Sequence, residues 1–511
     1  MEDYFKRNEK ISLIDNTVSD IEKTKILSFS LILAIFLDRF FIEKDAGVSV
    51  LIFVILCLGI FLCSVKDRGK ALNNIVSFEK KNLMRTIILL SVIFIAGTFA
   101  LFSNEVLAFL NIIFVIIGFA FYCVLSTNKK DLEKMSYVKA VLKRLIPRSF
   151  ENTPKPFVFL NKFIKSRKKV ETNSEIYKVL KGILIALPVL AIILVLLSSA
   201  DMMFSYYLIR MFGMFGDIKI ASIILHSVII VAAFLYIFGF LWSFKYEGIY
   251  EDVKEEWSLR FEALTIMPIF VILNIVYVLF TAVQFSYLYG GGNALLPENF
   301  TYAEYARRGF FELVTVAIIN FTIILCAMKF TKKQNGKIEK LNKIFMSFLI
   351  VFTINMLFSA HYKMSLYEAT YGYTYLRVFV HIFMLLIFIL FIIVFLGIWT
   401  RKVAVGKLCL ITSVLMYVIL NYINVDIFIV KKNLELSGKT QKLDMTYLAN
   451  LSYDTIPYMV DFCLNNNSEK SNNLRRELEE KKSILLDTDY NWYEFNLSRY
   501  KGEKALKRLN K

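Results

Sequence analysis

The sequence predicts an all-α protein, a polytopic membrane helical bundle of about eleven transmembrane helices with a small helical C-terminal domain. Hydrophobic residues make up 57% of the 511 positions and charged residues only 20%, so a water-soluble fold could not cover its surface with polar groups. The apolar residues gather in blocks of roughly 17–25, a length that crosses about 30 Å of hydrocarbon. The loops between these blocks alternate between rich and poor in Lys and Arg, as the loops of membrane proteins do.

The N-terminal part of the chain is expected to contain a cytoplasmic segment, four spans and a basic loop. Residues 1–25 mix acidic and basic side chains without a small-residue cleavage site, so we expect a retained segment and not a signal peptide. Residues 126–175 form a cytoplasmic loop with thirteen Lys or Arg. The four spans between them, in residues 26–125, are predicted at Ile26–Phe41, Gly47–Val65, Thr86–Phe102 and Val106–Leu125.

Residues 176–423 are predicted to form a seven-helix transmembrane core, and residues 424–511 an extracytoplasmic helical tail domain. The tail contains apolar residues at helical spacing in MTYLANLSYDTIPYMVDFCL and a charged amphipathic segment, SNNLRRELEEKKSILLD. It either packs on the outer face of the bundle or binds a wall or membrane partner. The seven spans are predicted at Ile176–Ser198, Ile218–Phe244, Phe261–Leu288, Phe310–Phe330, Leu341–Ser359, Leu376–Trp399 and Leu408–Ile423.

The distribution of basic residues predicts the orientation of the chain. Five alternate loops hold thirty Lys and Arg, whereas the five loops between them hold five. Because basic loops remain in the cytoplasm, the N-terminus is predicted to be cytoplasmic and, after an odd number of spans, the C-terminus extracytoplasmic. The formal net charge of +18 lies mostly in loops beside the spans. It therefore predicts contact with anionic lipid of the bilayer, and no nucleic-acid partner.

The stretch NFTYAEYARRGFFELV places unusual charge beside the eighth span. Thr301 and Glu304 have the spacing of a capping box, so a helix is expected to begin there. Glu304, Arg308 and Glu312 then share one helical face, with Arg307 beside them. One interpretation is an interfacial anchor in which Arg308 pairs with Glu312. The other is a polar cleft that opens outward.

Further polar residues lie at the same predicted outer ends of the spans and favour a shared, outward-facing polar vestibule. His361 is the best acid–base candidate among them. In contrast, four mid-span residues are expected to bond neighbouring helices: His226, Asn274, Asn320 and Asn355. The candidate vestibule residues are Asp38, Asp201, Gln284, Glu304, Arg307, Arg308, Glu312, His361, Lys363 and Arg377.

No motif assigns catalytic residues. The sequence lacks GxxxxGK[ST], GxGxxG after a strand, HExxH and GxSxG, which disfavours an ATP-driven transporter and a zinc protease. The six Cys include no CxxC, so no zinc site is indicated. We therefore predict neither a cofactor nor a metal.

Six segments, occurring in order, carry a resemblance to a known family: VQFSYLYGG, FTYAEYARRGFFEL, SAHYKMSLYEATYGYTYLR, NVDIFIVKKN, LDMTYLANLSYDTIP and WYEFNLSRYKGEKAL. From about Ile176 to the C-terminus, the chain resembles an uncharacterised family of bacterial multi-pass membrane proteins, domain of unknown function 4173, and its relative, domain of unknown function 4153. The resemblance implies a location in the bacterial cell membrane. It implies no activity and no catalytic residues.

Three functions remain open at this stage. In the first, the vestibule binds a lipid-linked or envelope substrate, with Asp38, Glu304 or Glu312 as a general base or metal ligand and arginines at 307, 308 and 377 holding phosphate. In the second, the protein is a transporter or flippase with the vestibule as its outer gate. In the third, it is a non-catalytic sensor or scaffold. The first is favoured slightly over transport.

Overall fold

In the computed structural model of this 511-residue chain, every regular element of the described residues is a helix. The described residues are 15, 18–64, 83–127, 137–159, 193, 197, 201–213, 220–246, 261–288, 310–331, 336–400, 403–436, 444–466, 468–486 and 488–509.

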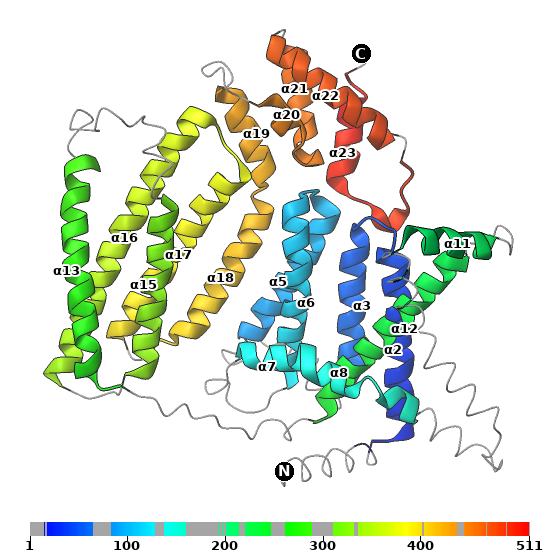
Figure 1. The fold of residues 1–511 in the computed structure, drawn as a ribbon, viewed down its shortest axis with the longest axis horizontal. Coiled ribbons are helices and arrows are strands. Elements are labelled where there is room, and N and C mark those ends of the chain that lie inside the picture. The colour runs from blue at the N-terminus through cyan, green and yellow to red at the C-terminus, as the bar shows by residue number, and fades with distance from the viewer. Residues whose placement is uncertain are drawn as a thin grey trace. The chain divides into compact units, whose positions relative to one another are not determined.

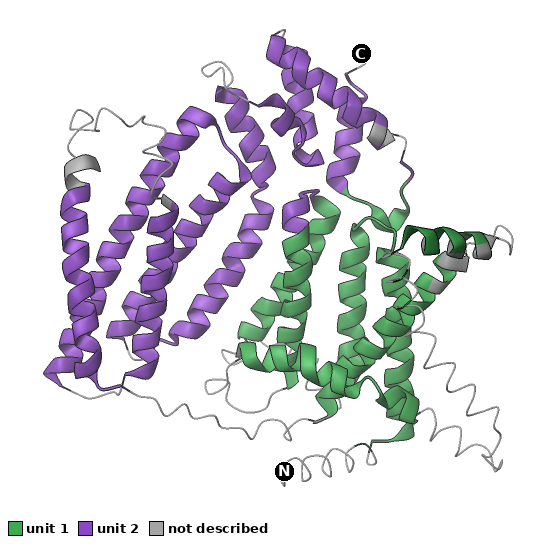
Figure 2. Cartoon of the chain, in the orientation of Figure 1, with its two compact units in different colours: residues 1–101, 109–254, 490–496 green, residues 102–108, 255–489, 497–511 purple. Residues whose placement is uncertain are grey.

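The chain divides into two compact units, which differ in colour in Figure 2. Unit 1 comprises residues 1–101, 109–254 and 490–496, and unit 2 comprises residues 102–108, 255–489 and 497–511. The division falls within α6, Glu105–Thr127, whose first turn belongs to unit 2. Each unit is therefore assembled from segments that are distant in the sequence.

Unit 1 is built from long apolar helices and several short ones. Helix α2 packs against α12 and α3, and α3 packs against α5. The backbone of Gly239 in α12 approaches the carbonyl oxygen of Ser149 so closely that a Cβ at this glycine would lie 2.1 Å from it. The described helices are α2 (Asp20–Phe41), α3 (Val48–Ser64), α5 (Leu83–Leu101), α6 from Phe109 on, α7 (Tyr137–Lys143), a π-helical turn η2 (Arg144–Arg148), α8 (Ser149–Asn152), α11 (Met202–Gly213), α12 (Ile220–Ser243) and the 3-10 turns η3 (Phe244–Tyr246) and η5 (Trp492–Glu494).

Five long helices of unit 2 lie side by side (Figure 1). Their shared core contains Phe270, Ala317, Leu349 and Phe391, one from each of the first four helices. Mid-span polar groups add bonds between helices: Asn274 Nδ2 donates to the carbonyl of Phe345, 3.0 Å, and Asn320 Nδ2 donates to Thr353 Oγ1, 2.9 Å. The interhelical bonding predicted for these two asparagines is confirmed, whereas that of Asn355 stays a prediction. The helices are α13 (Ala263–Leu288), α15 (Phe310–Phe330), α16 (Lys337–Tyr371), α17 (Tyr375–Trp399) and α18 (Val405–Tyr422).

The C-terminal helices of unit 2 gather around a second core (Figure 1). Buried side chains such as Ile429, Leu448, Val460 and Leu474 meet there, together with Val378 from α17. This core forms because each short helix has only one apolar face, which must be buried against its neighbours. The helices are α19 (Val425–Leu436), α20 (Met445–Ala449), the 3-10 turn η4 (Tyr453–Thr455), α21 (Ile456–Asn465), α22 (Glu469–Leu486) and α23 (Leu497–Leu506).

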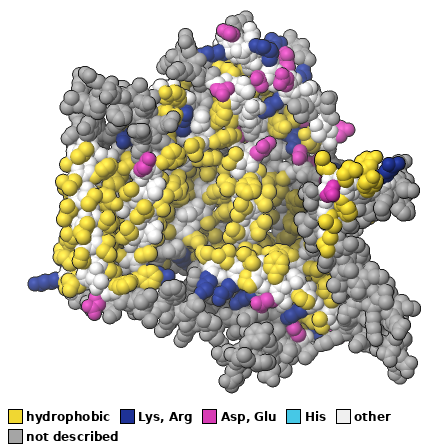
Figure 3. Space-filling model, in the orientation of Figure 1, with side chains coloured by type: hydrophobic (Ala, Val, Ile, Leu, Met, Phe, Trp, Pro, Cys, Tyr) yellow, Lys and Arg dark blue, Asp and Glu magenta, His cyan; other side chains and the backbone are white. Residues whose placement is uncertain are grey.

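Eight helices of the described part of the chain are long and apolar enough to cross a membrane. On the face of unit 2 shown in Figure 3, hydrophobic side chains cover the sides of the long helices, and acidic and basic ones gather toward the helix ends. Exposed residues such as Ile272, Leu279 and Leu396 are more than half accessible, as expected for side chains that face lipid. The chain is therefore a multi-pass, membrane-embedded protein.

Ten of the eleven predicted spans coincide with described helices, and most of Ile176–Ser198 lies outside the described residues. Helix α3 has 17 residues and is shorter than the other apolar helices. The total of eleven spans, the domain boundaries and the separate tail domain stay predictions. One helix differs from its predicted span: α16 does not end near Ser359 but continues for three more turns to Tyr371.

Candidate functional site

The ten predicted vestibule residues fall into three groups. Glu304, Arg307 and Arg308 lie outside the described residues, as does the capping box at Thr301. Two residues, Asp38 and Asp201, belong to unit 1. The five that belong to unit 2 are Gln284, Glu312, His361, Lys363 and Arg377. A single vestibule holding all ten stays a prediction.

The two residues of unit 1 have distinct local roles. Asp38 in α2 is only 6% exposed, and its Oδ1 lies 2.7 Å from Nδ1 of His226 in α12. The bonding of His226 to a neighbouring helix is thus confirmed. Asp201 is exposed and caps α11, because its Oδ1 accepts hydrogen bonds from the amides of Met203 (2.7 Å) and Phe204 (3.2 Å).

In unit 2, the polar residues lie near the C-terminal end of α13, in the first turn of α15 and after the apolar run of α16. Gln284 Nε2 donates to Ser359 Oγ, 2.9 Å, and so joins α13 to α16. The Oε1 atom of this glutamine is buried without a hydrogen-bond partner in the described structure. Glu312 in α15 lies near enough to Lys363 in α16 for the two charges to interact. These contacts place four of the five predicted residues on neighbouring helices, with His361 two positions before Lys363.

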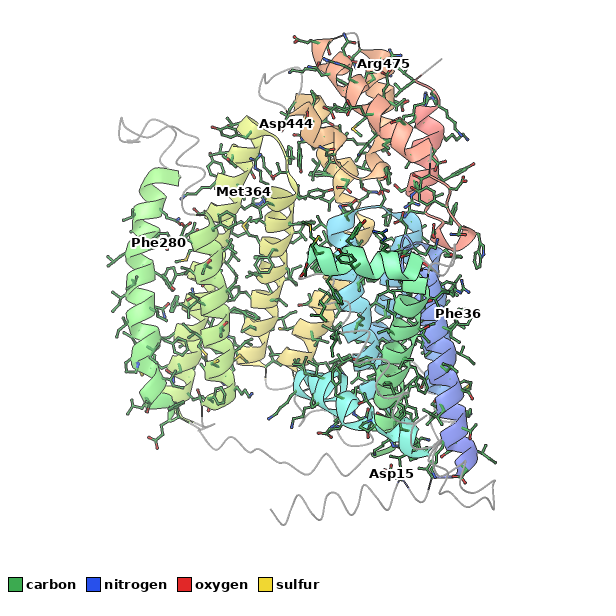
Figure 4. The ribbon with its side chains drawn as sticks, turned by 45° about the vertical axis from the view of Figure 1, so that its right-hand side comes forward. Asp15, Phe36, Phe280, Met364, Asp444 and Arg475 are labelled. Carbon is green, nitrogen blue, oxygen red and sulfur yellow. The ribbon has the colours of Figure 1, made fainter. Side chains whose placement is uncertain are left out.

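The extra length of α16 determines which residues meet. The helix has 35 residues, or about 50 Å, whereas the hydrocarbon layer is about 30 Å thick. Its apolar run ends at Ala360, and the helix then continues through a more polar stretch to Tyr371, with Gly372 as its C-cap. In Figure 4, Met364 marks this part of α16. His361 and Glu368 therefore lie on one continuous helix, about two turns apart.

A chain of three titratable side chains joins α16 to α17. His361 Nδ1 lies 2.8 Å from Nδ1 of His381, and Nε2 of His381 lies 3.0 Å from Oε2 of Glu368. The first residue is exposed, the second is intermediate and Glu368 is only 3% exposed. The Oε1 atom of Glu368 is buried and has no hydrogen-bond partner in the described structure. The contacts thus lead from an exposed imidazole to a buried carboxylate.

Arg377 fixes the turn between these two helices. Its Nη1 donates to the carbonyl of Tyr371, 3.1 Å, and to the carbonyl of Gly372. Its guanidinium lies over the ring of Tyr367, 4.3 Å from the centroid. These contacts satisfy carbonyl groups at the C-terminus of α16, where a cation is favoured. They hold the helix end that carries Glu368 against the start of α17.

A second buried polar cluster, the Asp426 cluster, lies where α17, α19 and η4 meet residues 102–108. Asp426 is 1% exposed, and its Oδ2 accepts hydrogen bonds from Asn104 Nδ2 (2.8 Å) and from Ser452 Oγ. Asp454 accepts hydrogen bonds from Asn424 Nδ2 (3.0 Å) and from the amide of Ser103 (2.9 Å). Ser452 Oγ also lies 3.2 Å from Oδ2 of Asp454, so one hydroxyl proton is shared between two carboxylates.

The electrostatics of this cluster are dominated by burial. Burial raises the pKa of the Asp426 carboxyl, hydrogen bonds from Ser452, Tyr375 and Asn104 partly offset that rise, and the charge of Asp454 adds to it. Burial also lowers the pKa of Lys481, a nearby cation whose amine donates to the carbonyl of Leu451, 2.8 Å. Both shifts follow from the cost of holding a charge away from water.

Of the two clusters, the sequence predicted only His361 as a candidate site residue. Glu368, His381, Asn424 and Asp426 are polar residues beside apolar runs, but no periodic signal pairs them. Some partners also come from far along the chain: Asn104, for example, is 322 residues from Asp426. An acid in the first turn of a helix after a span was the available signal for Asp426.

The described residues include no group of three or more His, Cys, Asp or Glu side chains that could hold a metal ion. The His361–His381–Glu368 chain can accept, pass on and release protons. This is possible because a neutral imidazole carries both a hydrogen-bond donor and an acceptor. Lys363 and Arg377 add positive charge at the same end of unit 2.

A family model described as Domain of unknown function (DUF4153) matches residues 88–462. The match covers most of the chain, including the His361–His381–Glu368 chain and nearly all of the Asp426 cluster. It confirms the expected resemblance to domain of unknown function 4153, while that to domain 4173 stays a prediction. No curated protein and no solved structure matches the chain.

Proposed function

The chain belongs to the family described as Domain of unknown function (DUF4153), and because that description assigns no activity, we propose a function from the chain's own geometry. We propose that the polar end of unit 2, formed by α13, α15, α16 and α17, faces outward from a bacterial cell membrane. There it binds a lipid-linked or envelope substrate with an anionic headgroup.

The observation that carries this proposal is the His361–His381–Glu368 chain. Ionisable groups within or beside membrane helices are costly, and those that occur are commonly functional. This chain lies directly after an apolar run of α16, at the level at which a lipid headgroup would meet the protein. Its position therefore supports a site that acts at the membrane surface.

The charge at this end supports an anionic substrate. Lys363 is half-buried beside Glu312, and Arg377 lies at the turn into α17. The sequence adds two more cations, Arg307 and Arg308, outside the described residues. Amine and guanidinium groups bind phosphate through charge-assisted hydrogen bonds. A phosphate-bearing lipid would place its tails along the exposed apolar faces of the same helices.

The proposal is tested by binding of a polyprenyl phosphate to the purified full-length protein in nanodiscs, measured by native mass spectrometry. Lys363→Ala should weaken binding by about tenfold, the equivalent of about 1.4 kcal/mol, because one charge-assisted contact is lost. Lys343→Ala provides the matched control, since Lys343 lies at the opposite end of the same helix, where it pairs with Glu339. Equal effects of both substitutions, or no binding by the unmodified protein, would refute the proposal.

A transporter is the second candidate, and the same chain of residues favours it. Chains of Asp, Glu and His side chains serve as proton pathways in pumps and transporters. In this alternative, the polar end of unit 2 is the outer gate, and translocation is coupled to protonation of Glu368. Uptake of the same polyprenyl phosphate into sealed vesicles, driven by a pH gradient, would distinguish transport from binding alone.

A further inference from the structure

We propose that His361, His381 and Glu368 form a proton relay, in which two imidazoles connect the exposed surface of α16 to a buried protonation site at Glu368. The relay itself is inferred from the geometry alone. Its role in the protein rests on the proposed function. Its basis is the pair of contacts of 2.8 and 3.0 Å, which are consecutive through the two nitrogens of His381.

The ring protons of the relay have one consistent arrangement when both imidazoles are neutral and Glu368 is ionised. The carboxylate can only accept, so Nε2 of His381 must donate to it. Nδ1 of His381 is then an acceptor, and Nδ1 of His361 must donate to it. Both N–H donors of the relay therefore point toward the carboxylate of Glu368. Nε2 of His361 is left as the basic atom that can take up a proton.

Proton transfer then balances without any other reactant. A proton from water binds Nε2 of His361, whose Nδ1 proton passes to Nδ1 of His381. The Nε2 proton of His381 passes to Oε2 of Glu368, so the carboxylate becomes neutral and both imidazoles return to the neutral form. Afterwards Glu368 donates to Nε2 of His381, and Nδ1 of His381 donates to Nδ1 of His361. Both hydrogen bonds are kept with their directions reversed, so the relay can also run backwards.

Glu368 is the buried end of this path. It is 3% exposed, and its Oε1 is buried without a hydrogen-bond partner in the described structure. The hydrogen bond from His381 to Oε2 is therefore the contact through which a proton can reach this buried carboxylate.

The charged and titratable groups around Glu368 come from four segments. His361 lies on α16, His381 and Arg377 on α17, and Tyr373 in the turn between them. Lys363, also on α16, interacts with Glu312 of α15. Lys432 and Glu435 of α19 lie near Tyr373 and pair with each other. The Nη1 atom of Arg377 donates to two backbone carbonyls. His381 is thus the titratable group whose hydrogen bond to Glu368 defines the path of the proton.

The relay is tested by time-resolved infrared spectroscopy of the full-length protein in nanodiscs after a laser-induced fall in pH. A protonated carboxyl band should appear between about pH 8 and about pH 4. The part of the carboxyl band that is lost in Glu368→Gln is assigned to Glu368, because other carboxyl groups, Asp426 among them, also take up protons as the pH falls. His361→Gln keeps a hydrogen-bonding side chain but cannot become an imidazolium. It should therefore slow the rise of that part of the band about 100-fold, the scale of a lost acid–base group, while leaving its final amplitude unchanged.

Three controls make the outcome decisive. His226→Gln removes the histidine of unit 1 that pairs with Asp38 and should leave the rate unchanged. Size-exclusion profiles identify any variant that fails to fold, and His381→Gln then provides a second interruption of the same path. An unchanged rate in folded His361→Gln and His381→Gln, or a carboxyl band in Glu368→Gln that is identical to that of the unmodified protein, would overturn the relay. Failure of polyprenyl phosphate binding would instead refute only the proposed function.

Discussion

Single buried carboxylates are the residues of this protein whose environment has the clearest physical consequence. Asp426 packs against Asn104, Ser452 and the carboxylate of Asp454, and its pKa is raised chiefly by burial. Its folded pKa therefore lies above its unfolded value, so the folded state binds the proton more tightly than the unfolded state. The contribution of Asp426 to stability is then fully present below the unfolded pKa and is lost as the pH rises through the folded pKa.

This sign predicts that Asp426 contributes more stability to the packing of α19 to α23 as the pH falls through its folded pKa toward the ordinary pKa of an aspartate, about 3.9. Asp426→Asn should flatten that pH dependence and leave the fold intact, because the amide oxygen can still accept from Asn104. The measurement is hydrogen exchange of the C-terminal helices across pH, corrected for the intrinsic exchange rate. Asp461→Asn is the matched control, since Asp461 is half exposed and pairs with Arg508 at the surface. A pH dependence that is unaltered in Asp426→Asn would contradict the prediction.

At this scale the sequence predicted residue types better than residue partners. Asn274 and Asn320 were expected to bond neighbouring helices because an amide within a span must be satisfied, and both do so. The direct link between His361 and His381 was not predicted. It depends on the register of α17 against α16, which hydropathy does not specify.

Among the secondary-structure elements, α16 shows how function depends on where a helix ends. Hydropathy predicted a span that closes near Ser359, because the following residues are polar. The helix nevertheless continues to Tyr371, since no Gly or Pro interrupts it before Gly372. Gly372 has a φ of 76° and a ψ of −178°, a conformation that is essentially restricted to glycine. Its amide donates to the carbonyl of Glu368, 2.8 Å, and this hydrogen bond closes the helix.

Substitution Gly372→Ala should therefore destabilise the protein by about 1–3 kcal/mol, through backbone strain at this position. The strain would also displace the carbonyl that accepts from Arg377, so the α16–α17 turn should loosen locally. Thermal unfolding in detergent, compared with that of Gly336→Ala, measures the effect. Gly336 precedes α16 with an extended backbone, and a Cβ there would meet open space. Equal stability of the two variants would show that the turn tolerates a side chain.

Across the whole molecule, the apolar blocks were the most predictable feature. They identified a multi-pass helical protein because a helix that faces lipid must be apolar over about 20 residues. The division into two units was harder to predict from the sequence. Residues 490–496 belong to unit 1, although the residues on either side of them belong to unit 2. The amide of Val48 donates to the carbonyl of Phe495, 3.1 Å, a contact between distant segments that no local pattern encodes.

The last prediction concerns the orientation in the membrane on which an outward-facing site depends. Thirty Lys and Arg lie in one set of loops and five in the other, and basic loops are retained in the cytoplasm. Alkaline phosphatase fused after Lys511 should therefore be active, and a green fluorescent protein fused there should be dark, because each folds on one side only. An insertion of the same reporters between Thr331 and Gly336, before α16 begins, should give the opposite pair of signals. If instead the C-terminal fusion fluoresces and lacks phosphatase activity, the end of α16 that carries His361 and Lys363 faces the cytoplasm. The anionic substrate would then have to be sought on the inner leaflet.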